Sequence, residues 1–209
     1  MTISDIWCEK YRPSTLDEIV LDKSTKNYFN KVQQDKNIPN VLFVGKPGIG
    51  KTSLAKIIVK DILKCQYLYI NASDENGIDT IRTKVLQKAL RNSIEEYHDL
   101  TRFVLTANYK HKIIPALQSR CQVFDITYDK NEYLTKLISI VKAEEIKINK
   151  ENFTNIVNSC YPDFRKGINT LQKYYLSDGE NTTGTITTEF LAGLIDLLSQ
   201  KKYFLIRKT

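Results

Sequence analysis

Gly45-Lys46-Pro47-Gly48-Ile49-Gly50-Lys51-Thr52 is the stretch that decides the fold of this 209-residue chain. It matches the pattern G-x-x-x-x-G-K-[ST], a glycine-rich turn whose backbone N–H groups converge on phosphate. The helix that follows such a turn adds its dipole to the attraction for an anion. In this pattern the lysine, Lys51, reaches the β and γ phosphates, and the hydroxyl of Thr52 binds Mg²⁺. We therefore expect residues 45–52 to bind a nucleoside triphosphate.

The sequence on both sides of this loop alternates between strand and helix signals. An apolar, β-branched run at 41–44 precedes the loop, and apolar residues at helical spacing follow it over 51–64. Further strands are expected at 67–70, 103–106 and 123–126, and an amphipathic helix at 85–97. This order predicts an α/β fold in which helices cover both faces of a parallel sheet.

Strand signals stop after residue 128, and helical signals replace them. Apolar residues at helical spacing predict helices around 134–141, 153–160, 164–171 and 190–198. We therefore expect a nucleotide-binding domain at 1–128 and a small all-helical domain at 129–209.

The bulk composition excludes several classes of protein. The net charge of +7 suits a polyanionic partner, although lysines scattered over the surface would give the same total. The four cysteines form no C-x-x-C pair, so neither a zinc site nor a disulfide framework is indicated. No stretch approaches the roughly 18 apolar residues of a membrane span, and the first residues do not resemble a signal peptide. We expect a soluble, intracellular protein with no membrane partner.

A P-loop identifies the phosphates of a ligand but not the reaction. Guanine-binding proteins of this class usually carry an N-K-x-D stretch, which the chain lacks, so ATP with Mg²⁺ is the expected ligand. Two rivals remain open on these residues alone. One is a P-loop enzyme such as a small-molecule kinase, and the other is an assembly or scaffold protein that binds ATP without hydrolysing it.

Several motifs outside the P-loop point to one family. They are Trp7-Cys8-Glu9-Lys10-Tyr11-Arg12-Pro13, Thr106-Ala107-Asn108, Ser119-Arg120-Cys121 and Asp163-Phe164-Arg165-Lys166. In this order around a P-loop they resemble the motifs of sliding-clamp loader small subunits, AAA+ ATPases of the replication factor C and T4-type phage clamp loader kind. The resemblance covers most of the chain and favours a clamp loader over a small-molecule kinase.

The resemblance implies a role for each motif. Tyr11, Arg12 and Pro13 would line the adenine side of the site, and Asn108 (sensor 1) would orient the attacking water. Arg165 (sensor 2) would reach the phosphates from a helical lid, while Arg120 would act as an arginine finger in the site of a neighbouring subunit. With Lys51, the implied catalytic residues are thus Asn108, Arg120 and Arg165.

The resemblance also implies partners. The stretch from Asn71 to Arg82 is similar to a turn and helix start that face DNA, which makes Arg82 a candidate phosphate contact. The implied partners are other clamp-loader subunits, a ring-shaped sliding clamp and primer-template DNA. The implied activity is the ATP-driven loading of that clamp during DNA replication, in a host cytoplasm if the source is viral and in a nucleus if it is eukaryotic.

The sequence departs from the family in two places. The family has a Walker B strand, an apolar run that ends in Asp-Glu, but the 28 residues from 74 to 101 contain only helical patterns. Because that acidic pair orders Mg²⁺ and polarises water, we expect a chain shortened internally near 83–86 in which hydrolysis is uncertain. The family's helical collar domain is also expected to be absent, which leaves ring assembly uncertain.

Overall fold

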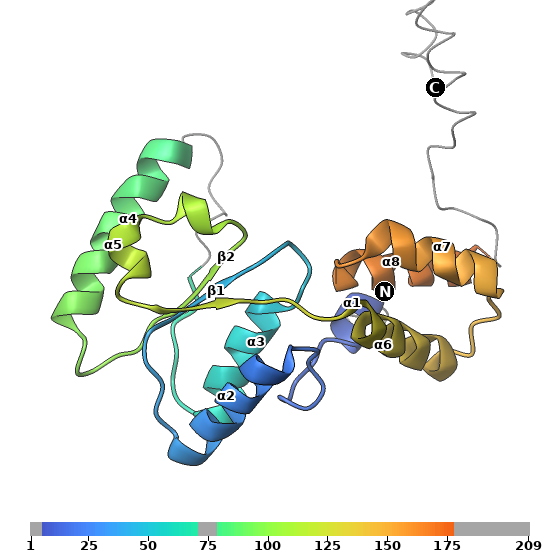
Figure 1. Ribbon diagram of the computed structural model, residues 1–209, viewed down its shortest axis with the longest axis horizontal. Helices are drawn as coiled ribbons and strands as arrows, with labels where there is room; N and C mark the ends of the chain where they lie inside the picture. Colours follow the sequence, from blue (N-terminus) through green and yellow to red (C-terminus); the bar gives the residue numbers. More distant parts are fainter. Residues whose placement is uncertain (1–5, 71–78, 178–209) are drawn as a thin grey trace, which may run out of the picture.

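The computed structural model describes residues 6–70 and 79–177 and has a parallel sheet at its centre (Figure 1). Strand β1 (Val41–Val44) lies between β2 (Val104–Ala107) and β3 (Gln122–Asp125). Both pairings are parallel, and Val44 lies opposite Ala107 on one side and Asp125 on the other. The carboxyl ends of the strands therefore meet at one edge, where the P-loop begins. The predicted α/β class is confirmed.

Alternation along β1 explains why helices cover both faces of the sheet (Figure 1). Successive side chains of a strand point to opposite faces. Val41 and Phe43 join one buried cluster with residues of α2 (Lys23–Asp35) and α3 (Lys51–Ile57). Leu42 and Val44 join a second cluster with residues of α4 (Asp79–Glu96) and α5 (Pro115–Gln118). Both faces are thus buried, which is why 41–44 reads as an unbroken apolar run.

Three of the four expected strands are present, and the fourth is wrong. β2 and β3 begin within a residue of the predicted 103–106 and 123–126. The apolar run at 67–70 is not a strand; Leu68 and Ile70 are 85% and 72% exposed. β2 is one of the two edge strands of the described sheet, so no described strand lies on its outer side to pair with this run. A run with high β propensity still needs a ladder partner to form a strand.

The helices flanking the sheet follow the predictions with two differences. The predicted helix at 51–64 is present, but α3 continues as a π-helical turn, η2 (Ile58–Ile62). The predicted helix at 85–97 corresponds to α4, which begins earlier, at Asp79, and ends at Glu96, yet its apolar stripe is only partly covered. Ile94 is 4% exposed, whereas Val85 is 59% exposed.

A buried polar residue also attaches α4 to the rest of the domain. The Gln87 amide donates to the backbone oxygen of Lys112 at 3.0 Å and accepts from the backbone N–H of Ile114 at 2.8 Å. These partners lie at the end of a 3₁₀ turn, η3 (Lys110–Lys112), and just beyond it. The helix is therefore fixed to the segment that follows β2.

Between β3 and residue 177 the helices are α6 (Lys130–Ala143), α7 (Lys150–Cys160) and α8 (Phe164–Leu176), as the periodicity predicted. Their buried residues, including Tyr133 and Leu171, belong to the same core cluster as Phe43. The predicted helix at 190–198 lies outside the described residues. The domain limits 1–128 and 129–209 stay predictions.

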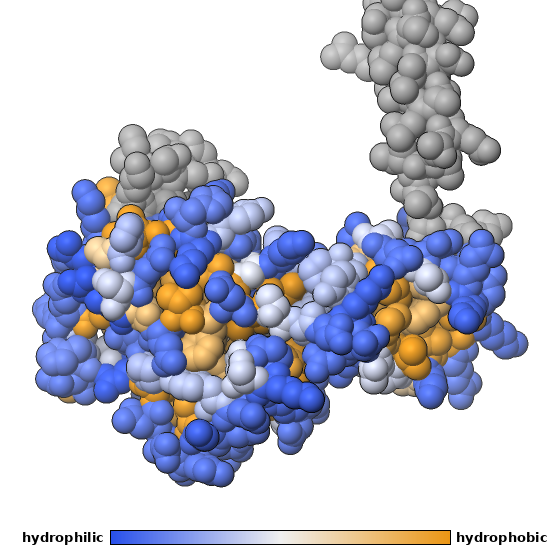
Figure 2. Space-filling model, in the orientation of Figure 1, coloured by the Kyte–Doolittle hydropathy of each residue, from blue (hydrophilic) through white to orange (hydrophobic). Residues whose placement is uncertain are grey.

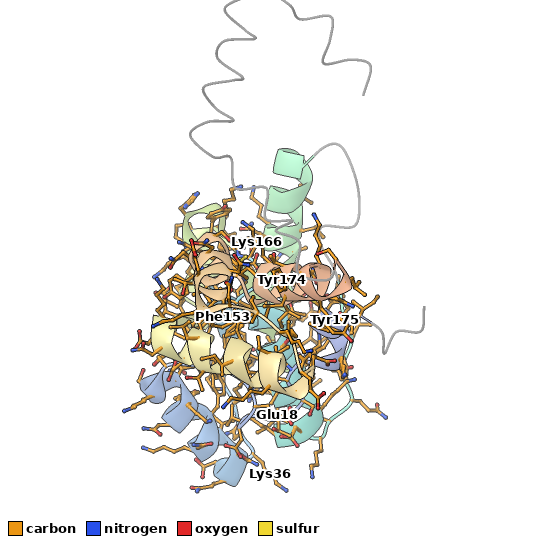
Figure 3. All side chains as sticks on the ribbon, turned by 90° about the vertical axis from the view of Figure 1, so that its right-hand side faces the viewer. Glu18, Lys36, Phe153, Lys166, Tyr174 and Tyr175 are labelled. Atoms are coloured by element: carbon orange, nitrogen blue, oxygen red, sulfur yellow. The ribbon has the colours of Figure 1, made fainter. Side chains whose placement is uncertain are left out.

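A short helix near the start of the chain, α1 (Trp7–Lys10), packs on α8. The Trp7 backbone N–H donates to Gln172 Oε1 at 3.1 Å, and the rings of Trp7 and Tyr175 are 5.4 Å apart. Figure 3 shows this side of the molecule, with Tyr174 and Tyr175 labelled on α8. None of the helices described here has both the length and the apolar character that crossing a membrane requires.

Candidate nucleotide-binding site

The P-loop joins β1 to α3, the strand–loop–helix context that the sequence predicted. Gly48 and Gly50 have φ angles of +73° and +98°, a left-handed conformation that glycine adopts without a Cβ penalty. Gly50 is also the N-cap of α3. The loop therefore ends directly on a helix N-terminus, where the free backbone N–H groups favour an anion.

Lys51 is the buried cation of this loop. Its side chain is folded back, and Nζ donates to the backbone oxygens of Gly45 at 2.8 Å and Lys46 at 2.7 Å. Burial and, to a smaller extent, the positive charge of Arg165 lower the pKa of Lys51 to about 8, although the negative charge of Asp163 opposes this shift. The ammonium thus lies inside the loop, where phosphate oxygens would replace carbonyl partners. The neighbouring Lys46, by contrast, is exposed.

Thr52 is the second residue of α3 and is partly buried. In the described ranges, no group of three or more His, Cys, Asp or Glu side chains is placed to hold a metal ion. Mg²⁺ usually keeps several waters and binds through one or two protein oxygens together with substrate phosphates. The residues present therefore fit a magnesium ion held mainly by Thr52 and the nucleotide.

Asn108 follows β2 directly and is exposed. Ala107 lies opposite Val44, and the backbone N–H of Gly45 donates to the Ala107 oxygen at 3.3 Å. This register places Asn108 beside the first residue of the P-loop, at the sheet edge where the sequence placed it.

The start of α8, one of the helices that follow β3, contacts the P-loop. The backbone N–H of Phe164 donates to the oxygen of Gly48 at 3.2 Å. This contact brings Arg165, the second residue of α8, close enough to Lys51 to affect its pKa. Residues more than 100 positions apart in sequence thus meet at one loop.

Asp163 belongs to the motif at 163–166, but the sequence predicted no role for it in nucleotide binding. In the structure its carboxylate accepts from the Lys166 backbone N–H at 2.9 Å and caps α8. A Cβ built on Gly48 would overlap that carboxylate, so the two residues are in tight contact. An aspartate just before a helical pattern is a recognisable N-cap signal, but the pattern does not tell which loop the cap will touch.

An open hollow of about 400 Å³ follows the same helix. In Figure 3, Lys166 is labelled on this part of α8. The hollow is lined by Asp163, Arg165, Lys166, Asn169, Thr170 and Lys173. The hollow is therefore formed by α8 and its cap and does not include the P-loop lysine.

The amino-terminal motif contacts α8 and the end of α6. The Tyr11 hydroxyl donates to Glu144 at the end of α6, and burial and this hydrogen bond raise the pKa of Tyr11 to about 12. Arg12 pairs with Glu9 at 2.7 Å, and Pro13 is partly buried. Ile19, a few residues on, is in van der Waals range of a Cβ built on Gly50. The segment thus passes beside the P-loop, while Tyr11 is bonded to α6.

Two predicted residues are not brought to this loop. Arg120 follows α5, where it pairs with Glu95 of α4 and donates to the backbone oxygen of Ala116 at 2.7 Å. A residue that acts on a neighbouring subunit would also lie away from its own P-loop. The backbone of Arg82 lies in α4, but its side chain lies outside the described residues.

Comparison with known protein families and folds agrees with this geometry. The profile of the ATPase family associated with various cellular activities (AAA) matches residues 41–81. Among solved structures, the Holliday junction branch migration motor RuvB of Thermotoga maritima aligns with a TM-score of 0.59 at 18% identity. That alignment covers 78% of this chain and 64% of RuvB. The likeness supports an AAA+ arrangement of the P-loop sheet and the following helices.

Curated relatives share more of the sequence. The replication factor C small subunit of Methanococcus vannielii is 40% identical over 79% of this chain and 63% of the relative. The replication factor C small subunit of Sulfolobus acidocaldarius is 34% identical over 94% of this chain and 69% of the relative. The chain thus spans about two thirds of the length of these relatives.

The second of these alignments is longer than the chain itself. It extends over 230 positions, whereas this chain has 209 residues in all. At least 21 positions of the alignment therefore have no residue in this chain.

Proposed function

Because this chain belongs to the replication factor C small-subunit family, we propose that it is an ATP-binding subunit of a clamp loader. In this function it helps to open a ring-shaped sliding clamp and to place it on primer-template DNA during DNA replication. The observation that carries the proposal is the contact between the P-loop and the start of α8, two distant parts of the sequence, where the backbone N–H of Phe164 donates to the oxygen of Gly48. A lid that contacts the phosphate cradle can couple nucleotide binding to movement of the subunit.

The proposed roles follow from the position of each residue. Residues 45–50 supply backbone N–H groups to the phosphates, Lys51 supplies charge, and Thr52 holds Mg²⁺, which would neutralise developing phosphate charge. Asn108, which follows β2 beside the P-loop, is proposed to orient a water molecule, and Arg165 is proposed to contact the γ-phosphate. Tyr11, Arg12 and Pro13 are proposed for the adenine side.

Contacts beyond the subunit are proposed for two arginines. Arg120 would leave Glu95 to reach a neighbouring subunit's nucleotide, and Arg82 would contact a DNA phosphate. The Arg120–Glu95 pair is partly exposed at both side chains, and exposed pairs contribute only about 0–1 kcal/mol. The pair is therefore weak enough for a nucleotide phosphate to replace it.

Turnover depends on an acidic pair that the sequence does not supply. We propose that the strand carrying it belongs beside β2, on the edge that is open in the described sheet. The positions that the Sulfolobus alignment leaves without a residue support an internal shortening. Sequencing of the encoding gene and intact-mass measurement of its product test this; a contiguous gene whose product has the mass of this chain would exclude an artefact of the record.

The second candidate is a scaffold that binds ATP without hydrolysing it, and the open edge of β2 favours it for the chain as it stands. Filter binding of ATP beside a phosphate-release assay, with sliding clamp and primer-template DNA present, separates the two. Phosphate release that is lost in Arg120→Ala supports the clamp loader. ATP binding without release supports the scaffold.

A further inference from the structure

The carboxylate of Asp163 lies against the phosphate cradle. A Cβ on Gly48 would overlap Oδ1 and Cγ of Asp163, so there is no room for a side chain between the loop and this carboxylate. The contact is held on both sides. The next residue, Phe164, donates its N–H to the backbone oxygen of Gly48 at 3.2 Å, and Tyr133 Oη donates to the backbone oxygen of Asp163 at 3.3 Å.

Three charges therefore surround one loop. Lys51 and Arg165 are positive and attract phosphate, whereas Asp163 is negative and repels it. Arg165 is exposed, while Asp163 is partly buried and fixed as the cap of α8. Its side chain has a smaller range of positions than that of Arg165, so its charge stays near the loop unless the start of α8 itself moves.

We propose that Asp163 is an affinity-setting residue of the nucleotide site, whose carboxylate opposes the phosphate charge and restrains ATP binding until the start of α8 moves away. The inference rests on the proposed ATP site at residues 45–52. The start of α8 would then have two opposite effects on the phosphates: Asp163 repels them and Arg165 attracts them. Movement of α8 would then withdraw the carboxylate, and the guanidinium would stay on the phosphates.

A substitution can remove the charge and keep the helix cap. Asparagine caps helices about as well as aspartate, so Asp163→Asn separates the electrostatic effect from helix stability. Asp22→Asn is the matched control, because Asp22 caps α2 through the backbone N–H groups of Ser24 and Thr25, both at 3.0 Å. It removes the same charge from another helix cap.

The experiment is a titration of the full chain with a fluorescent ATP analogue and Mg²⁺ at pH 7.0. We expect Asp163→Asn to lower the dissociation constant about 3- to 30-fold, and Asp22→Asn to leave it unchanged. The gain should shrink in high salt, because salt screens exposed charges. It should also fall along the series ATP, ADP, adenosine as the ligand loses charge, which a purely structural role would not produce.

The outcomes distinguish this inference from the proposed site. If Lys51→Ala binds ATP as well as the unchanged chain, the P-loop site itself is wrong. If Lys51→Ala loses binding but Asp163→Asn binds ATP no more tightly than Asp22→Asn, the role of Asp163 is overturned. Asp163→Ser, which also keeps a capping side chain, provides the same comparison if the asparagine variant does not fold.

Discussion

At the scale of single residues, Lys51 gives the site a pH dependence. Its pKa is lowered from 10.5 to about 8, mainly by burial and also by the charge of Arg165, and only the protonated form attracts phosphate. Below pH 8 Lys51 is charged and ATP binding is strongest. As the pH rises through 8, the free energy of ATP binding must also include the cost of protonating Lys51. We expect the dissociation constant for ATP to rise, by up to about tenfold per pH unit, between pH 8 and 9.5.

Calorimetric titrations at constant ionic strength measure this dependence. Lys51→Arg is the control, because arginine stays charged throughout the range. If the two proteins show the same profile above pH 8, Lys51 is not the group responsible.

The P-loop glycines allow a second prediction at this scale. Gly48 and Gly50 both have left-handed backbones, but only Gly48 touches Asp163; a Cβ on Gly50 would be 3.6 Å from Ile19 Cδ1. Gly48→Ala should therefore destabilise the fold about 1–3 kcal/mol more than Gly50→Ala, since the backbone strain is common to both. Urea unfolding of the two variants without nucleotide measures the difference, and equal losses would argue against tight contact between α8 and the loop.

Sequence reasoning at the residue scale worked where a motif implies local geometry. Residues 45–52 form the expected turn, and the position of Asn108 beside Gly45 follows from parallel pairing. It missed Asp163, because contact between a helix cap and a loop 115 residues earlier depends on tertiary packing. The pairing of Arg120 with Glu95 was missed for the same reason.

At the scale of elements, close packing of α6 and α8 depends on Gly167. A Cβ there would overlap the Tyr133 hydroxyl, and Tyr133 is fully buried. We expect Gly167→Ala to cost about 1–3 kcal/mol of unfolding free energy. Adding Tyr133→Phe removes the overlapping oxygen and should recover part of that loss. Urea unfolding of both single variants and the double variant tests this; strictly additive losses would mean that the two groups are not in contact.

Elements with strong periodicity were predicted well, and an element that needs a partner was not. The run at 41–44 and the three described helices after residue 128, α6, α7 and α8, are fixed by their own apolar patterns. The run at 67–70 has the composition of a strand, but β2 is the sheet edge and Leu68 stays exposed. Composition alone could not reveal that the described sheet has no strand beside β2 with which this run could pair.

At the scale of the whole molecule, the open sheet edge should promote association. Figure 2 shows apolar side chains gathered on the visible face of the α/β unit. Leu68 and Ile70 are highly exposed, and unpaired strand edges and apolar patches favour contacts between chains. Leu68→Lys should therefore reduce self-association at high protein concentration, as measured by sedimentation velocity. Leu176→Lys is the control, since Leu176 is 63% exposed on α8. If both variants reduce self-association equally, the added charge acts through general solubility and not through the surface around Leu68.

Lys51 is the residue through which the P-loop of the whole molecule is proposed to bind ATP. Isothermal titration of ATP and Mg²⁺ into the full chain measures its contribution, with Lys46→Ala as the control for an exposed lysine of the same loop. We predict that Lys51→Ala weakens binding at least about tenfold, because it removes the buried charge that faces the phosphates, while Lys46→Ala stays near the unchanged chain. Equal affinities for the unchanged chain and Lys51→Ala would contradict the account.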